Sequence, residues 1–360
     1  MSKEFSRRKF IKGAALGVAG VSAASLGLLK LGTAAKAETV PAPAEEVESV
    51  EAITTPNVPV MFQNGIKLRW FNNAGFEIVL PSGRHILVDP WLDHAGYWTF
   101  PAEKVERCDF VILSHSHGDH AADCGTLQKR FGRYVLMCPE WGVEQIMLDM
   151  DLDIRNIYRV CDGRKYEFDD VIFEVFGSRH TESNSFSSFG SKTENAGFKD
   201  FKLEADYGTY DVVNYLITSK LDGTKILIWA GMTTEDQKYA LKDTHADIAI
   251  VHISPKQNMD LMGQMVAQWG PRVVMPHHYD IWDTKGGISW AMHQRSVSPE
   301  QAARYLPATD PGTPESGFNT ALYMADQGAA IKRHAPNATF LMIEHQKWYK
   351  FSTCYELLDE

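Results

Sequence analysis

Short apolar runs separated by turn residues make up most of the chain beyond residue 65. Three such runs between residues 67 and 90 are separated by Asn72-Asn73 and by Pro81-Ser82-Gly83, which predicts three successive strands joined by tight turns. The run FVILS at 110–114 has no polar alternation, so the pattern predicts a strand that is buried on both faces. The first part of the domain is therefore expected to be a meander of strands.

Further along the chain, apolar runs alternate with amphipathic stretches. Strands are expected at 134–138, 156–160, 166–170, 171–177, 210–219, 225–231, 247–254 and 272–278, with a final strand pair at 338–345 and 347–352. Helices are expected at 121–131, 140–150, 258–269 and 298–306. A meander followed by alternating strands and helices predicts an α/β (α+β) fold, with two mixed sheets and helices packed outside them.

The segment 181–209 interrupts this pattern with a polar stretch that contains four phenylalanines: Phe186, Phe189, Phe198 and Phe201. A loop of this length in a compact domain is commonly a lid or a binding loop. The four rings are expected either to line an apolar substrate cleft or to form a small core under the loop.

The first 37 residues have the pattern of an export signal and are set apart from the fold. The stretch SRRKFIK at 6–12 resembles the twin-arginine signal, and Ala35-Lys36-Ala37 offers a cleavage site after a Gly- and Ala-rich core. An ordinary basic leader and an uncleaved membrane anchor are the alternatives. The resemblance implies export of the folded protein to the periplasm by the twin-arginine translocase.

The composition and net charge of the chain limit the kinds of partner that it is expected to bind. Residues 38–58 are rich in Pro, Ala and Glu and are expected to be a linker, which leaves 59–360 as the folded domain. The formal net charge is −10, and because residues 1–37 contribute +6, the remainder carries −16. An acidic chain without a basic stripe argues against a nucleic-acid partner. The five cysteines form no CxxC pair and are expected to be mostly buried free thiols.

The stretch ILSHSHGDH at 112–120 places three histidines and an aspartate within six positions, directly after an apolar run. His115 and His117 are two apart, and in an extended chain such residues face the same way, so both imidazoles can reach one ion. Asp119 and His120 follow a glycine turn and are expected to project toward the same pocket. Imidazole and carboxylate suit zinc, manganese or iron, so the stretch predicts a metal centre. A histidine cluster of no chemical consequence is the alternative.

The run His115-Ser116-His117-Gly118-Asp119-His120 resembles the H-x-H-x-D-H signature of the metallo-β-lactamase fold superfamily. Asp89-Pro90-Trp91 resembles the D-P-W of its lactonase-like branch, which includes ascorbate-phosphate lactonase and the phospholipase D that cleaves N-acyl phosphatidylethanolamine. The resemblance covers about residues 65–285. It implies a four-layer αββα sandwich that holds one or two divalent ions, with zinc as the first expectation and manganese or iron as alternatives.

The resemblance also implies how the ligands divide between two metal sites. The first site would consist of three histidines: His115, His117 and His180. The second would consist of Asp119, His120 and His278. His277 is expected to support the centre from outside, because adjacent strand residues face opposite ways. Asp89 is expected to buttress a ligand imidazole. For His180, an ordinary loop histidine is the alternative.

One residue of the family pattern is absent. The family usually places a bridging aspartate in a Gly-Asp pair after a strand such as 225–231, but this chain has Gly231-Met232. A thioether neither bridges two divalent ions nor offsets their charge. Either the second site is weak or empty, or Glu235 or His252 compensates. The alternatives are that Glu235 is the N-terminal acid of a helix and that His252 is a hydrogen-bonded core residue.

The resemblance therefore implies an enzyme, a metal-dependent hydrolase that acts on a lactone, ester or phosphodiester in a small-molecule or lipid-like substrate. With one metal, Asp119 is expected to act as the general base or to orient the attacking water; with two metals it would be a ligand, and a hydroxide between the ions would attack. One alternative is a degenerate member with a mononuclear or empty site that only binds a ligand. Another is an oxidative member with two irons, which is disfavoured because such members keep a site richer in carboxylates.

Overall fold

The structure is a computed structural model, and it describes residues 50–52, 65–95, 98–139, 152–180, 212–255, 257–280, 299–305 and 318–351. Four expected features lie outside these residues: the export signal, most of the linker, the helix at 140–150 and the phenylalanine-bearing loop at 181–209. β1 (Val50–Ala52) lies within the stretch that is expected to be a linker, and it pairs in parallel with β15 (Trp348–Phe351).

Within the described residues, the first sheet has eight strands in the order β1-β15-β2-β3-β4-β5-β6-β7. Besides β1 and β15, these are β2 (Ile66–Asn72), β3 (Gly75–Val79), β4 (His85–Val88), β5 (Phe110–Ile112), β6 (Val135–Pro139) and β7 (Ile157–Val160). β15, β2, β3 and β4 pair antiparallel, whereas β4 to β7 pair in parallel. The carboxyl ends of β4 and β5 therefore meet at one edge of the sheet, where Asp89 and His115 follow them.

The second sheet has seven strands in the order β14-β13-β12-β11-β10-β9-β8, again among the described residues. They are β8 (Lys165–Glu167), β9 (Val171–Ser178), β10 (Val212–Ser219), β11 (Lys225–Trp229), β12 (Ile248–His252), β13 (Val273–His277) and β14 (Thr339–Phe340). β11, β12 and β13 pair in parallel, and their carboxyl ends lead into Met232, His252 and His278. These three strand ends lie side by side.

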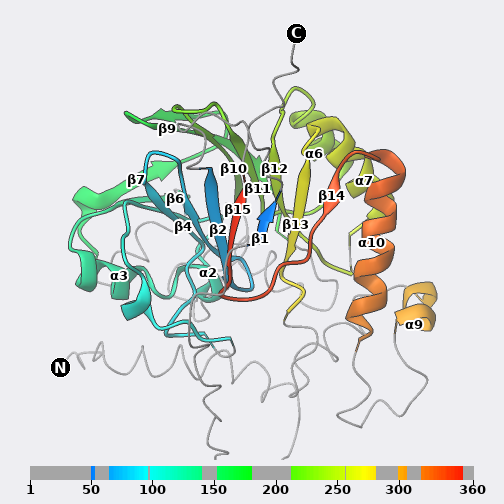
Figure 1. Ribbon diagram of the computed structural model, residues 1–360, viewed down its shortest axis with the longest axis horizontal. Helices are drawn as coiled ribbons and strands as arrows, with labels where there is room; N and C mark the ends of the chain where they lie inside the picture. Colours follow the sequence, from blue (N-terminus) through cyan, green and yellow to red (C-terminus); the bar gives the residue numbers. More distant parts are fainter. Residues whose placement is uncertain are drawn as a thin grey trace, which may run out of the picture.

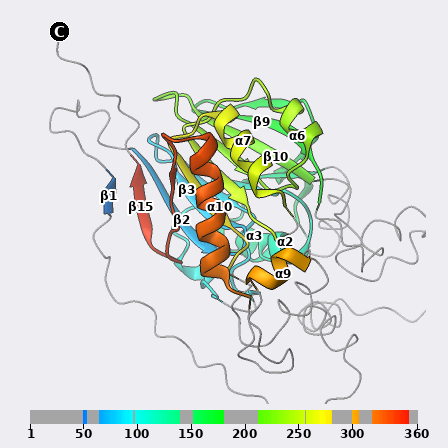
Figure 2. The same cartoon turned by 90° about the vertical axis from the view of Figure 1, so that its right-hand side faces the viewer.

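The helices cover the outer faces of the two sheets (Figures 1 and 2). Within the part of the chain that the structure describes, the α-helices are α2 (Gly118–Ala121), α3 (Cys124–Phe131), α6 (Glu235–Ala240), α7 (Met259–Trp269), α9 (Pro299–Tyr305) and α10 (Thr320–His334), and 3-10 turns occupy Ala102–Lys104 and Ile154–Asn156. α6, α7 and α10 flank the seven-stranded sheet, and α3 lies beside the eight-stranded one. Among the described helices, none combines the length and apolarity that a membrane crossing requires.

Alternation along the strands explains the layers. Ile86, Val88, Phe110 and Ile112 belong to the large core that joins the two sheets. Their neighbours Leu87 and Val111 face the other way, into a second cluster with Ala121, Cys124 and Leu127 of the helices. β5 is thus buried on both faces, as its lack of polar residues predicts. The predicted fold, two mixed sheets with helices outside them, is confirmed.

Two expectations about the C-terminal part are wrong or incomplete. The final strands do not pair with each other: β14 joins the seven-stranded sheet beside β13, while β15 lies between β1 and β2 in the other sheet. The long helix α10 was not expected from the sequence. It packs closely on α7, since a Cβ at Gly263 would lie 2.6 Å from the Ala330 carbonyl oxygen. Only glycine allows so close an approach of the two helices.

Candidate metal centre

The histidine-rich stretch lies at the carboxyl end of β5 and passes directly into α2. His117 is the N-cap residue of α2, with an extended backbone (φ −62, ψ 153), so the chain is still strand-like up to this residue. Asp119 and His120 lie in the first turn of the helix. This change from strand to helix turns the motif's side chains toward one region, as the spacing predicts. The single helix expected at 121–131 is divided in two, since α2 ends at Ala121 and α3 begins at Cys124.

The first group of metal-ligand side chains contains His115, His117 and His180, and each offers a nitrogen within 4.8 Å of the others. The ring centroids of His115 and His180 are 5.0 Å apart, and those of His117 and His180 are 4.6 Å apart. His180 follows β9 of the other sheet, so the group joins the two sheets. The buried Nε2 of His115 has no hydrogen-bond partner in the described part of the chain.

The second group contains Asp119, His120 and His278, again with ligand atoms within 4.8 Å of one another. His120 lies 4.0 Å from His115 between ring centroids, so the two groups are adjacent. His278 follows β13 and has a left-handed backbone with φ 69. The two groups have the same members as the sequence predicts, while their occupancy by metal stays a prediction.

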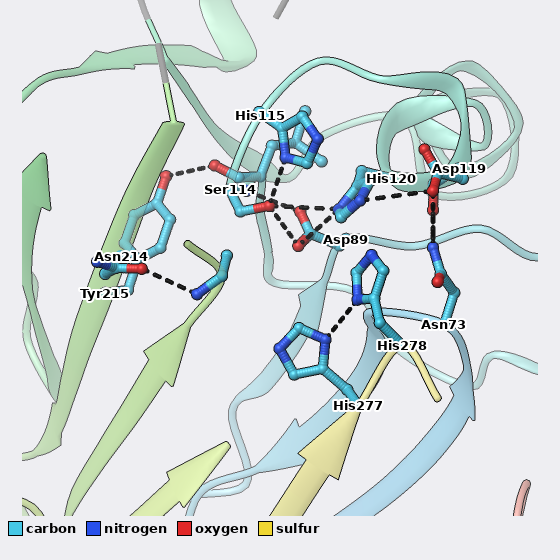
Figure 3. Close-up of polar contacts among 12 residues, drawn as sticks. Asn73, Asp89, Ser114, His115, Asp119, His120, Asn214, Tyr215, His277 and His278 are labelled. Carbon is cyan, nitrogen blue, oxygen red and sulfur yellow. Dashed lines mark hydrogen bonds and ion pairs between the residues drawn. The ribbon is translucent and has the colours of Figure 1, made fainter. Parts of the chain in front are cut away.

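Asp89 and Ser114 contact the Nδ1 side of the His115 and His120 imidazoles (Figure 3). The Ser114 amide and hydroxyl both donate to Asp89, at 2.7 Å each. The same two residues also contact the histidines. His120 Nδ1 lies 3.0 Å from Asp89 Oδ2, and His115 Nδ1 lies 3.0 Å from Ser114 Oγ. A ring held through Nδ1 presents Nε2 to an ion, which is the usual arrangement around a metal. Asp89 therefore buttresses His120, in the position that the sequence predicts.

Asn73 links the two outer ligands of the second group, and the sequence pattern identified it only as a turn residue. Its side-chain amide donates to Asp119 Oδ2 at 2.8 Å, and its carbonyl accepts from the His278 amide at 3.1 Å. Its own amide donates to Asp280 at 2.8 Å. Asn73, Asp89 and His278 all have positive φ, at 40°, 42° and 69°. Such backbone strain concentrates at functional sites.

The remaining sequence-predicted residues fall in different places. His277 is buried, and its Nδ1 lies 2.6 Å from Nδ1 of His278 while its Nε2 lies 3.0 Å from the Trp229 carbonyl oxygen. His252 is buried with its ring 4.7 Å from that of His278. Glu235 is 76% exposed at the start of α6, where it pairs with Lys238. Glu235 is not brought to the centre.

Met232 lies where the family pattern has a bridging aspartate, and its backbone position is tightly constrained. Its amide donates to the Arg179 carbonyl at 2.9 Å, next to His180. A Cβ on the preceding Gly231 would overlap the Ser178 hydroxyl and lie 3.1 Å from the Arg179 carbonyl oxygen. The strand end therefore approaches the His180 segment closely, and only glycine fits there. The Gly231-Met232 pair is thus held beside the first group.

Burial and mutual repulsion control protonation at the centre. Burial, with the neighbouring imidazoles, lowers the pKa of His115 and His278 well below the ordinary value. Burial also lowers the pKa of His120, but Asp119 and Asp89 outweigh it and raise the pKa. Burial would raise the pKa of Asp119, but His120, His117 and the Asn73 bond lower it overall. The shifts thus favour neutral imidazoles at His115 and His278 and an ionised carboxylate at Asp119, whereas the two carboxylates favour the protonated form of His120.

These residues fit divalent metal ions. Neutral imidazoles with one carboxylate form a donor set that zinc, iron and manganese accept. An inward nitrogen such as His115 Nε2, buried without a described hydrogen-bond partner, is costly unless something binds it. The first group would hold one ion through three histidines, and the second would hold another through Asp119, His120 and His278.

A family model for the beta-lactamase superfamily domain matches residues 84–279, more than half of the 360-residue chain. The chain belongs to the beta-lactamase superfamily. Every residue of the two groups lies within the matched range of this superfamily domain. The sandwich of two mixed sheets is accordingly the metallo-β-lactamase fold.

Several relatives of this chain are named metal-dependent hydrolases. A UPF0173 metal-dependent hydrolase of Methanobrevibacter smithii is 24% identical over 222 residues, which cover 60% of this chain and 83% of the relative. A UPF0173 metal-dependent hydrolase of Koribacter versatilis is 33% identical over 78 residues, 22% of this chain and 34% of the relative. The second match thus spans about a third of that relative's length.

Solved structures support the fold. Igni18, a metallo hydrolase of Ignicoccus hospitalis, has a TM-score of 0.52 at 14% identity, covering 79% of this chain and 98% of its own. An isothiocyanate hydrolase from Delia radicum gut bacteria has a TM-score of 0.51 at 14% identity, covering 80% and 100%. At this identity the likeness establishes the superfamily's architecture and nothing finer.

Proposed function

We propose that this protein is an exported metal-dependent hydrolase, with zinc as its metal, that cleaves a lactone, ester or phosphodiester bond. The observation that carries the proposal is the pair of adjacent ligand groups, each with three ligand atoms within 4.8 Å of one another. Membership of the beta-lactamase superfamily and the names of the relatives, metal-dependent hydrolases, support the hydrolytic class.

Zinc is favoured over iron because imidazoles dominate the donor set. Five of the six residues in the two groups are histidines. Imidazole is a common zinc ligand, and such sites keep an open position for water or substrate. A divalent ion bound here would supply Lewis acidity toward a carbonyl or phosphoryl oxygen and would lower the pKa of a water toward about 7.

Asp119 is the side chain best placed to manage the proton of the attacking water. It is the carboxylate of the two groups, and its side chain keeps 38% of its exposure, whereas that of His120 keeps 2%. Asn73 fixes Oδ2 at 2.8 Å, so the carboxylate has a defined orientation. An ionised carboxylate within reach of solvent can orient water and accept its proton.

The buried network behind the ligands would keep this geometry constant during the reaction. Asp89 is 1% exposed and is fixed by two hydrogen bonds from Ser114. Charged and polar groups that are already oriented need no rearrangement as charge develops in the transition state. The proposed catalytic contribution of the chain is therefore orientation of Asp119 and of the imidazoles.

The substrate is proposed to be a small or lipid-like molecule, on the resemblance to the lactonase-like branch at Asp89-Pro90-Trp91. Export by the twin-arginine translocase to the periplasm is proposed on the stretch SRRKFIK at 6–12. Replacing both Arg7 and Arg8 with lysine should leave the protein in the cytoplasm of an expressing bacterium. Unchanged export of this variant would overturn the route.

Metal analysis of the purified protein tests the hydrolase proposal directly. We expect at least one zinc per chain that survives dialysis, and hydrolysis that is lost on chelation and recovers when zinc is returned. A panel of lactones, phosphodiesters and N-acyl phospholipids would identify the bond. Chelator-resistant hydrolysis, or no tightly held metal, would overturn the proposal. Two irons with oxidase activity would favour the oxidative alternative.

A further inference from the structure

His252 lies between the strand that leads to Met232, where the family pattern has a carboxylate, and the strand that leads to His278. It is the last residue of β12, whose neighbours are β11, leading to Met232, and β13, leading to His278. All three strands are parallel, and His252 is in register with His277. The carboxyl ends of parallel strands lie at the same edge of the sheet. His252 therefore lies next to Met232 and His278, at the edge that carries the candidate metal centre.

The ring of His252 approaches both ligand groups. Its centroid lies 4.7 Å from that of His278 in an edge-to-face arrangement. It also interacts electrostatically with His180 of the first group and with His120 and Asp119 of the second.

The ring is held in the way that metal-ligand histidines are held. Nδ1 lies 3.3 Å from the Gly231 carbonyl oxygen and 3.1 Å from the Gln257 side-chain nitrogen. Gln257 is itself fixed, since it donates to the Gly231 carbonyl at 3.1 Å and accepts from the Thr233 hydroxyl at 2.9 Å. The Gly231 carbonyl oxygen can accept the proton of Nδ1, and in that tautomer Nε2 carries the lone pair that an ion would bind.

This arrangement repeats what Ser114 does for His115 and what Asp89 does for His120, each through Nδ1. A ligand imidazole commonly donates its second nitrogen to a carbonyl or carboxylate, which fixes the ring and its tautomer.

We infer that His252 is a further metal ligand, which binds the ion of the second group in place of the carboxylate that Met232 cannot supply. The inference rests on the proposed function, because it requires the centre to bind metal. His252 stands beside the compact group rather than within it, so its ring should move toward His278 when the ion binds. Because imidazole is neutral, the substitution keeps a ligand but leaves the centre more positively charged than a carboxylate would.

Metal stoichiometry and affinity test the inference without relying on turnover. The apo-protein, its His252→Ala and His252→Gln variants and a His245→Ala control would be titrated with zinc, and with cobalt to follow ligand-field absorption. His245 is exposed, so its loss should change nothing. We expect two ions in the wild type, and an affinity for the second ion that is about 10–100-fold weaker in both His252 variants.

A rescue variant separates a ligand from a packing residue. Met232→Asp in the His252→Ala background restores a carboxylate at the family position and should return the second ion. Circular dichroism would confirm that the variants are folded, and His252→Gln keeps a polar side chain if alanine does not fold.

The outcomes distinguish the two proposals. A wild-type protein that binds two ions, with both His252 variants unchanged in affinity and cobalt spectrum, would overturn the inference and leave the hydrolase proposal intact. A wild-type protein that holds one ion would do the same, since there would be no second ion for His252 to bind. A wild-type protein that binds no metal would overturn the hydrolase proposal itself.

Discussion

The two ligand groups lie side by side but are built differently. The first, His115, His117 and His180, uses imidazoles alone and joins a strand end of one sheet to a strand end of the other. The second combines a carboxylate with two imidazoles, from α2 and from the end of β13. The first group thus has the composition of a self-sufficient zinc site, whereas the second has fewer strong nitrogen donors.

Support around the two groups is also unequal. Asp89 holds His120, Asn73 holds both Asp119 and His278, and His277 contacts His278. Around the first group, Ser114 contacts His115, and the Met232 amide donates to the Arg179 carbonyl next to His180. The second group thus depends on long-range hydrogen bonds, so it should be the more sensitive to changes outside the ligand set.

The largest effect is expected from His117→Ala in the first group. Removing one of three histidines should release the ion, and hydrolysis should fall about 10⁴-fold as ~5 kcal/mol of electrostatic stabilisation is lost. Activity assays with metal analysis measure both losses, and His245→Ala serves as the exposed control. Near-normal turnover would contradict the primary role of the first group.

Asp119→Asn should reduce kcat on the order of 10³-fold, because an amide cannot accept the proton of the attacking water. The first-group ion should be retained, since its three ligands are untouched. The measurement is steady-state kinetics with metal stoichiometry on the same sample. Retained kcat would refute the assigned role of Asp119, and loss of both ions would contradict the independence of the groups.

Asp89→Asn should weaken the second group selectively. Asp89 contacts His120 at 3.0 Å, and removal of such a supporting carboxylate commonly costs about 10–100-fold in metal affinity. Competition with a chromophoric chelator would report the two affinities separately. Asp326→Asn, on the outer helix α10, is the matched control. Equal weakening of both ions would mean that Asp89 acts through Ser114 on His115 as strongly as it acts on His120.

Asn73→Gly should have the smallest effect of these changes. Glycine tolerates the backbone φ of 40°, so the change removes the amide without adding strain. Loss of one hydrogen bond to a charged group is worth about 1.5 kcal/mol, which corresponds to about a 10-fold loss in affinity at the second group. Isothermal titration of the apo-protein checks this value. An unchanged second-site affinity would show that Asn73 does not position Asp119.

Local sequence predicted much of the fold and of the ligand set. The spacing of His115 and His117 in a strand end predicts that they face the same way, and the alternation of apolar residues predicts the strands of both sheets. Three of the predicted buried thiols, Cys108, Cys124 and Cys138, are buried and form no disulfide with another described cysteine. These inferences need only the few residues on either side of each position.

Other features needed the folded chain. Asn73 looks like an ordinary turn residue in the sequence, and its contacts with Asp119 and His278 arise from segments far apart in the chain. Glu235 and His252 were equivalent candidates until the structure placed Glu235 in an exposed ion pair and His252 next to His278. β14 and β15 could not be assigned to different sheets, because sequence pattern does not report strand partners.

From the sequence alone, most strands and the types of ligand could be predicted, and the family resemblance implied that Met232 stands in place of a carboxylate. The tertiary structure decided which of the many histidines meet. That decision depends on parallel strands from two sheets ending at one edge, and on the left-handed backbone at His278. Both are consequences of how the sheets pack against each other, which no short stretch of residues encodes.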